Sequence, residues 1–194
     1  MKAKKSTKLL LATGVALALG AGSVQAQQSA LSYNYVEGLY HDGEVRGHDY
    51  DAAGARVSFT LTDSFFIKGS AIRGRTDHYV GSSKPRVRGY SGGVGYRVAI
   101  NQATDLVTGF EYVREKLGNN DRKGFAADMG VRTMYRDNIE FQGGLVYRDA
   151  KDFGGDLGFQ LETRLHLTPQ FAVTLGYADV DDLDGLHAGL RINF

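Results

Sequence analysis

Histidines and acidic residues gather between positions 41 and 51, and these residue types could form a hydrolytic site. The cluster consists of His41, Asp42, Glu44, His48, Asp49 and Asp51. A carboxylate beside a histidine orients the ring and stabilises its protonated form, so the histidine can act as a general base. The pairs in such a site would be His41 with Asp42 and His48 with Asp49. The alternative is a solvated polar loop, and we expect this chain not to be an enzyme.

No ligand spacing in the sequence matches a known metal site, and we expect neither a metal nor a cofactor. Four aspartates near position 180 could share a divalent cation, but their spacing departs from that of an EF-hand loop. These are Asp179, Asp181, Asp182 and Asp184. The chain also has no nucleophile elbow, no HExxH pair and no phosphate-binding loop.

Basic residues flank a polar segment between positions 74 and 87. They are Arg73, Arg75, Lys84, Arg86 and Arg88. Because the guanidinium group presents paired N–H donors that match a phosphate, these residues could contact lipid phosphates. A solvated basic loop is the alternative.

The elements that carry these groups show a period of two residues. Between residues 53 and 61 the odd positions are apolar (Ala53, Val57, Phe59 and Leu61 among them), and the even positions are small or polar. Such alternation is typical of a β-strand with one apolar face. It recurs in ten segments, at 31–41, 53–61, 65–71, 90–98, 106–112, 125–135, 139–148, 157–167, 171–177 and 186–194.

The first 26 residues have the layout of a secretory signal peptide. Four lysines precede an uncharged Leu/Ala/Gly run from Leu9 to Gly22, and small residues precede a cleavage position after Ala26. The run is too short for a spanning helix. We therefore expect a signal peptide at 1–26 and one mature domain at 27–194. Removal of the four lysines takes the formal net charge from +1 to −3, which makes nucleic acid an unsuitable partner.

The alternating segments predict an all-β chain, a transmembrane antiparallel up-and-down barrel of about ten strands, with eight as the alternative. An even number is required for closure. Short connections at 62–64, 99–103, 136–138 and 168–170 alternate with longer or more polar ones near 42–49, 74–87, 115–123, 149–155 and 179–184. Short periplasmic turns and longer outer loops have this asymmetry. In the first strand we place Val36, Gly38 and Tyr40 outward and Glu37 inward, although Tyr33 and Tyr35 favour the opposite register.

In such a barrel a set of charged residues faces the lumen. It comprises Glu37, Arg56, Lys68, Arg97, Glu111, Asp128, Arg132, Glu140, Arg148, Glu162, Arg164 and Arg191. Isolated buried charges are costly, so we expect these residues to pair and to fill the lumen of a small barrel. The alternative is a narrow pore with a slight preference for anions, because the set holds seven cations and five carboxylates.

The two ends of the mature chain resemble small outer-membrane barrel proteins of the OmpA and OmpX type. The resemblance lies in the first strand, Leu31 to Tyr40, and in the last residues, Leu190-Arg191-Ile192-Asn193-Phe194. The opening segment is most similar to a branch of small exported barrels once linked to quorum signalling and host immunity. The alternating end, with Leu190, Ile192 and Phe194, resembles the signal that the barrel-assembly machinery of a Gram-negative envelope recognises.

The resemblance implies an outer-membrane location, with lipids, lipopolysaccharide and the assembly machinery as partners. The five basic residues at 73–88 would then be candidates for contact with lipopolysaccharide. We expect a structural or surface-interaction role for a barrel with a plugged lumen. The alternatives are a narrow porin-like channel for small solutes and an outer-membrane hydrolase that uses His41, Asp42, His48 and Asp49.

Overall fold

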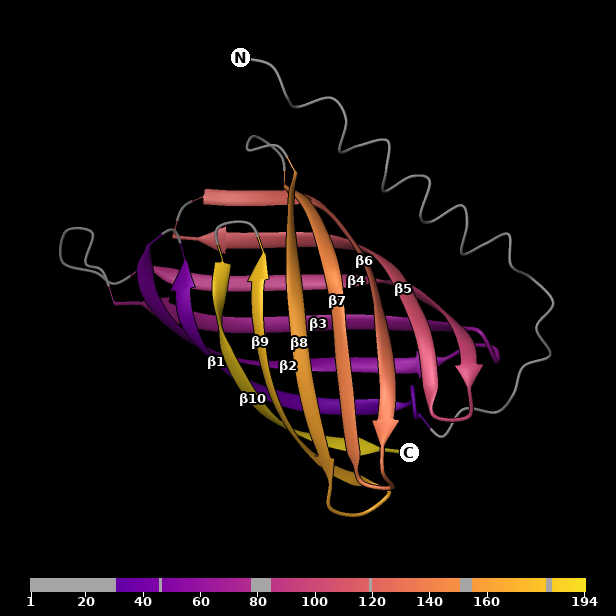
Figure 1. Cartoon of the computed structure of the whole chain (residues 1–194). Helices are drawn as coiled ribbons and strands as arrows, with labels where there is room; N and C mark the ends of the chain where they lie inside the picture. The colour runs from indigo at the N-terminus through magenta and orange to yellow at the C-terminus, as the bar shows by residue number, and fades with distance from the viewer. Residues whose placement is uncertain (1–30, 46, 78–84, 119, 151–154, 181–182) are drawn as a thin grey trace.

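A computed structural model describes residues 31–45, 47–77, 85–118, 120–150, 155–180 and 183–194 (Figure 1). The signal peptide expected at 1–26 lies outside the described residues. The described chain forms ten strands: β1 (Tyr35–Val45), β2 (His48–Thr60), β3 (Phe65–Thr76), β4 (Arg86–Asn101), β5 (Thr104–Leu117), β6 (Asn120–Tyr135), β7 (Ile139–Ala150), β8 (Asp156–His166), β9 (Phe171–Val180) and β10 (Leu183–Asn193). None of the described residues forms a helix long and apolar enough to cross a membrane.

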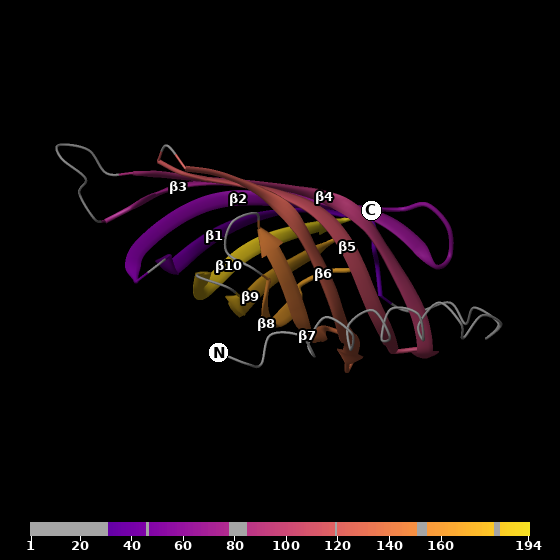
Figure 2. The same cartoon turned by 90° about the horizontal axis from the view of Figure 1, so that it is seen from above.

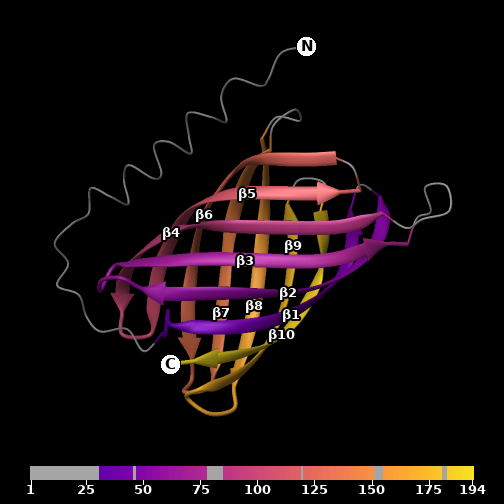
Figure 3. The ribbon, with the colours of Figure 1, turned by 180° about the vertical axis from the view of Figure 1, so that it is seen from behind.

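The ten strands form one closed antiparallel barrel, as the sequence predicts. Each strand pairs with its neighbours in sequence, and β1 closes the barrel on β10, from Tyr35 opposite Asn193 to Val45 opposite Leu183. Closure leaves no strand edge with unpaired backbone groups. The strands are strongly inclined, so β7 and β8 on one side cross the direction of β2–β4 on the other (Figures 1 and 3), and the turned view shows the sheet curving back on itself (Figure 2).

Side-chain alternation gives the barrel an apolar outer wall. Leu161 is 55%, Leu175 is 60% and Leu190 is 69% exposed, all at outward positions. In β1, Val36 and Tyr40 are exposed and Glu37 is fully buried, so the register proposed for the first strand is correct. A wall of exposed leucines is stable next to lipid and unfavourable next to water.

Short connections lie together at one end of the barrel, here called the turn end: 61–64, 102–103, 136–138 and 167–170. Both ends of the barrel chain lie there as well, since Phe194 N donates to Asn34 O. Hydroxyls hold two of these turns: Thr62 Oγ1 accepts from Phe65 N at 3.0 Å, and Thr168 Oγ1 accepts from Phe171 N at 3.1 Å. Threonine favours such local turns because its hydroxyl replaces a backbone partner.

The opposite end, here called the loop end, differs from the sequence prediction. Long connections are found at 77–85 and 151–155, but those at 46–47, 118–119 and 181–182 have only two residues. The prediction of longer loops at 42–49, 115–123 and 179–184 is therefore wrong, because polar strand ends continue the paired ladder as hairpins. Gly47 (φ 71°) and Gly118 (φ 59°) supply the positive φ that two-residue hairpin turns need.

Aromatic side chains form two girdles on the outer wall. At the turn end, Phe65 packs on Tyr96 with ring centroids 4.8 Å apart. Nearer the loop end, Phe159 packs on Tyr177 at 5.8 Å, while Tyr90 and Tyr112 are each 54% exposed. Aromatic rings at both levels mark the two interfaces between lipid and water.

Candidate functional site in the barrel lumen

The lumen near the turn end is crossed by a network of buried ion pairs, which begins at Glu140. On β7, Glu140 is fully buried and receives two hydrogen bonds from Arg132 of β6, Nε–Oε1 at 2.6 Å and Nη2–Oε2 at 3.0 Å. Arg164 of β8 also binds Glu140, and His166 Nε2 lies 3.0 Å from Glu140 Oε2. One carboxylate thus neutralises two guanidinium groups that are themselves almost completely enclosed.

The network continues to the opposite wall of the barrel. Arg164 also binds Glu162, which pairs with Arg56 of β2 (Nη1–Oε1, 2.5 Å). Arg56 Nη2 lies 2.8 Å from Glu37 Oε2, and Glu37 accepts from Arg191 Nη2 at 2.9 Å. Because β2 and β8 lie on different sides of the barrel, the Arg56–Glu162 pair bridges the lumen.

The remaining predicted lumen cations are also paired. Lys68 Nζ binds Asp128 and lies 2.7 Å from Glu111 Oε1. Arg97 pairs with Asp105 at 3.3 Å, and Arg148 pairs with Glu115 at 2.7 Å.

The structure places all twelve predicted lumen residues inside the barrel and adds two carboxylates that the sequence analysis missed, Asp105 and Glu115. Both lie at positions of β5 that alternate with outward residues, in phase with the predicted Glu111. Strand parity could have identified them, but each lies near a strand end that was assigned to a turn or loop. With these two, the seven predicted cations are matched by seven carboxylates, so the charge excess expected for an anion-preferring pore is absent from this set. Arg122 of β6, opposite Glu115 in the register, is a further inward cation.

The residues before β1 close the lumen at the turn end. Leu31 and Tyr33, expected in the first strand, instead lie inside the barrel and pack with Phe66 and Val107. Tyr33 Oη donates to Asp105 Oδ2 at 2.8 Å, and its ring lies 4.8 Å from that of Phe66. Arg97 and Arg132 cover the same ring, with guanidinium carbons 4.8 Å and 4.6 Å from its centroid.

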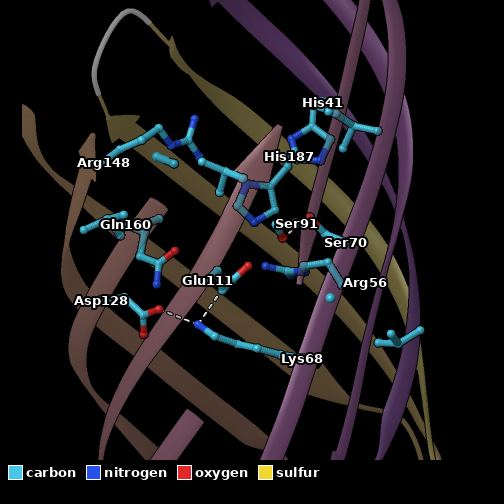
Figure 4. Close-up of a pocket in the computed structure, with 18 of the residues that line it drawn as sticks. His41, Arg56, Lys68, Ser70, Ser91, Glu111, Asp128, Arg148, Gln160 and His187 are labelled. Atoms are coloured by element: carbon cyan, nitrogen blue, oxygen red, sulfur yellow. Dashed lines mark hydrogen bonds and ion pairs between the residues drawn. The ribbon is translucent and has the colours of Figure 1, made fainter. Parts of the chain in front are cut away.

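Above this closure lies a polar chamber of about 280 Å³ (Figure 4). Lys68 points across it toward Glu111 and Asp128, and Ser70 hydrogen-bonds Ser91 at 2.8 Å on its wall. Toward the loop end Tyr50, Ala52, Val87 and Leu183 pack together as an apolar cluster, and Tyr50 and Leu183 line the chamber. The chamber therefore lies between the ion-pair network near the turn end and the apolar cluster near the loop end.

The structure does not assemble the predicted His–Asp rim. His41 points into the lumen, where its ring lies 5.4 Å from that of His187. Asp42, the next residue, faces outward and is exposed, so the two side chains lie on opposite faces of β1. His48 and Asp49 are exposed at the start of β2, also away from His41.

The described residues of the remaining predicted sites face away from the lumen. Asp179 and Asp184 are opposite each other on β9 and β10, and Asp181 and Asp182 lie outside the described residues. Within the described ranges, no three His, Cys, Asp or Glu side chains are grouped so as to hold a metal. Arg73, Arg75, Arg86 and Arg88 are on β3 and β4, whereas Lys84 lies outside the described residues.

The closed ladder, the apolar outer wall and the paired charges inside define a transmembrane β-barrel. The chain belongs to the family of the outer membrane protein beta-barrel domain, whose model matches residues 14–193. It is accordingly an outer-membrane barrel protein. No curated protein sequence matches the chain.

Two porins are among the solved structures with a similar fold. One is the KdgM porin in complex with disordered oligogalacturonate, with a TM-score of 0.51, 9% identity, and coverage of 81% of this chain and 99% of that chain. The other is the NanC porin, with a TM-score of 0.51, 10% identity, and coverage of 82% and 98%. At this identity the similarity concerns the fold alone.

Proposed function

We propose that this chain is a small integral outer-membrane barrel with a closed lumen, which acts as a structural or surface-interaction protein. The supporting observation is the buried network that joins Arg132, Glu140, Arg164, Glu162 and Arg56 across the barrel. Breaking one buried pair costs about 3–5 kcal/mol, because the remaining charge stays enclosed without a partner. A passing ion would have to separate several such pairs, so the lumen does not conduct.

We also propose that the protein has no enzymatic activity. The opposite orientations of His41 and Asp42 support this, because a general base needs its orienting carboxylate within hydrogen-bond distance. Hydrolysis at this end of β1 would require another partner for His41, whose Nε2 is enclosed in the lumen and has no hydrogen-bond partner in the described chain.

The proposed biogenesis follows from the sequence. A signal peptide at 1–26 directs export and is removed, and the assembly machinery recognises Leu190, Ile192 and Phe194. These three side chains are exposed on the outer wall of β10 and at its end, where another protein could contact them. The turn end then faces the periplasm and the loop end faces outward.

A narrow channel for small solutes is the second candidate, and the polar chamber of about 280 Å³ favours it. The chamber would form the middle of a pore if the ion-pair network near the turn end and the apolar cluster near the loop end both opened. Because the seven predicted cations are matched by seven carboxylates, we expect weak selectivity between anions and cations in that case.

Single-channel recording in planar bilayers separates the two candidates. The mature wild-type protein should give no current steps, whereas Leu31→Gly/Tyr33→Gly, which removes the closure at the turn end, should admit ions more often. The matched control Leu157→Gly/Tyr135→Gly removes one leucine and one tyrosine from the outer wall and should be silent. Regular steps from the wild type would refute the closed lumen and establish the channel.

A further inference from the structure

Four arginines stand together on the outer wall of β3 and β4 at the loop end, and we call them the arginine wall: Arg73, Arg75, Arg86 and Arg88. The strand register sets Arg73 opposite Arg88 and Arg75 opposite Arg86. All four share the outward face with Ala71 and the exposed Tyr90, which are paired one step further down. The arginine wall therefore lies next to Tyr90 of the aromatic girdle near the loop end, on the side away from the middle of the barrel.

Among the described residues, the charges of the arginine wall have no counterions. Neighbouring strands lie about 4.8 Å apart, and like charges directly opposite each other are destabilising. In the described part of the chain, no carboxylate forms an ion pair with any of the four, although Asp51 is opposite Arg75 in the register of β2 and β3. Arg88 Nε is enclosed and has no hydrogen-bond partner among the described residues. An external anion would relieve this repulsion.

The basic surface continues around the barrel onto β5 and β6. Lys116 is opposite Arg88, and Lys123 is opposite Arg114. Asp121 partly neutralises this extension, since Arg114 Nη2 lies 2.6 Å and Lys116 Nζ 3.5 Å from its Oδ2.

The other side of the loop end has the opposite charge. The acidic residues that face outward there, on β9, β10, β1 and β2, are Asp179, Asp184, Asp42, Glu44, Asp49 and Asp51. The register sets Asp42 opposite Asp51 and Glu44 opposite both Asp49 and Asp184. The loop end is thus divided into a basic and an acidic sector, and the charges favour the approach of an anionic partner to the basic sector.

We propose that the arginine wall binds the phosphate groups of lipopolysaccharide from the outer leaflet. The inference rests on the proposed orientation, with the loop end outward. At that orientation the wall lies just above the aromatic girdle, at the depth of lipid headgroups. Paired guanidinium N–H groups match phosphate oxygens in charge and geometry. A disaccharide headgroup with two phosphates can contact both arginine pairs at once, whereas a headgroup with one phosphate can contact only part of the wall.

Native mass spectrometry of the detergent-extracted, delipidated protein tests the proposal. The probes are bisphosphorylated lipid A, its monophosphorylated form and phosphatidylglycerol. The test variant is Arg73→Gln/Arg88→Gln. The control is Arg136→Gln, which removes an exposed cation at the turn end, away from the basic sector, and leaves the arginine wall intact. Retention of the heat-dependent gel shift shows that each variant is folded.

We expect the wild type to bind bisphosphorylated lipid A most tightly, and the Arg73/Arg88 variant to bind it roughly tenfold more weakly, because charge-assisted hydrogen bonds are lost. The control should stay within about twofold of the wild type. Equal binding by the Arg73/Arg88 variant would overturn the proposal, and so would equal binding of phosphatidylglycerol. A dimer that disappears in this variant would also overturn it, by assigning the wall to the acidic sector of a second copy. Binding in detergent is independent of orientation and conductance, so failure here is distinguishable from failure of the proposed function.

Discussion

At the residue scale, the closed lumen depends on how many partners each buried charge has. Glu140 binds Arg132 and Arg164 and also lies next to His166. Arg164 has a second carboxylate in Glu162, whereas Glu140 is the carboxylate that neutralises Arg132. Loss of the Glu140 charge therefore leaves a guanidinium group buried without a counterion, which is a costly defect.

We therefore expect Glu140→Gln to destabilise the barrel by about 3–5 kcal/mol. The matched control is Glu111→Gln, since Lys68 keeps its pair with Asp128 and should lose much less stability. Because the chain has no tryptophan, unfolding by urea is best followed by circular dichroism or by the fraction of heat-shifted protein on a gel. Equal losses for the two variants would contradict the role assigned to Glu140.

At the element scale, the last strand has two functions that must be separated. The ring of Phe194 packs 5.7 Å from that of Phe59, so this residue adds to packing as well as to the proposed recognition by the assembly machinery. Its backbone N–H donates to Asn34 O and ties the two chain ends together.

We predict that deletion of Phe194 lowers the folded yield in the outer membrane while refolding of the purified chain in detergent remains efficient. The physical reason is that detergent refolding needs only the apolar wall and the strand pairing, whereas assembly in the cell also needs recognition of the chain end. Phe171→Ala, which removes an exposed aromatic ring near the same end, serves as the control. A normal folded yield in cells after the deletion would refute the terminal signal.

Strand alternation was sufficient to predict the membrane-facing wall and twelve lumen charges, because lipid imposes a strict period of two. It was insufficient where the lipid ends. At the loop end the outward face carries Asp42, Glu44 and Asp49, so the alternation of apolar and polar residues disappears although the backbone ladder continues. Three hairpins were consequently predicted as loops, and His41 was assigned to the rim.

Closure of the lumen by the segment before β1 was beyond sequence reasoning for a different reason. Leu31 and Tyr33 have the alternation of a strand, and only tertiary packing shows that they enter the barrel. Their place there depends on Gly95, because a Cβ at that position would collide with the Phe66 ring, against which Tyr33 packs. A large residue opposite a small one on the neighbouring strand, as Phe66 is opposite Gly95, leaves no periodic signal in the sequence.

At the scale of the whole molecule, the two ends of the barrel differ in the length of their connections, in the position of the chain ends and in their surface charge. The turn end has short connections and both ends of the barrel chain, whereas the loop end has two long connections and the separated acidic and basic sectors. A barrel inserted from the periplasm must carry its loops across the membrane, while its termini stay behind. The arginine wall can meet lipopolysaccharide only if the loop end is the outer one.

Cysteine labelling in intact cells tests this orientation cleanly, because the wild-type chain contains no cysteine. Asp49→Cys and Asp156→Cys place a thiol at exposed positions of the loop end, and Asp137→Cys and Gln170→Cys place one in exposed turns of the opposite end. All four exchange one exposed polar side chain and should leave the barrel folded. A membrane-impermeant maleimide should label the first pair in intact cells and the second pair only after the outer membrane is permeabilised. Labelling of the Asp137→Cys or Gln170→Cys variant in intact cells would reverse the orientation and withdraw the arginine wall from the outer leaflet.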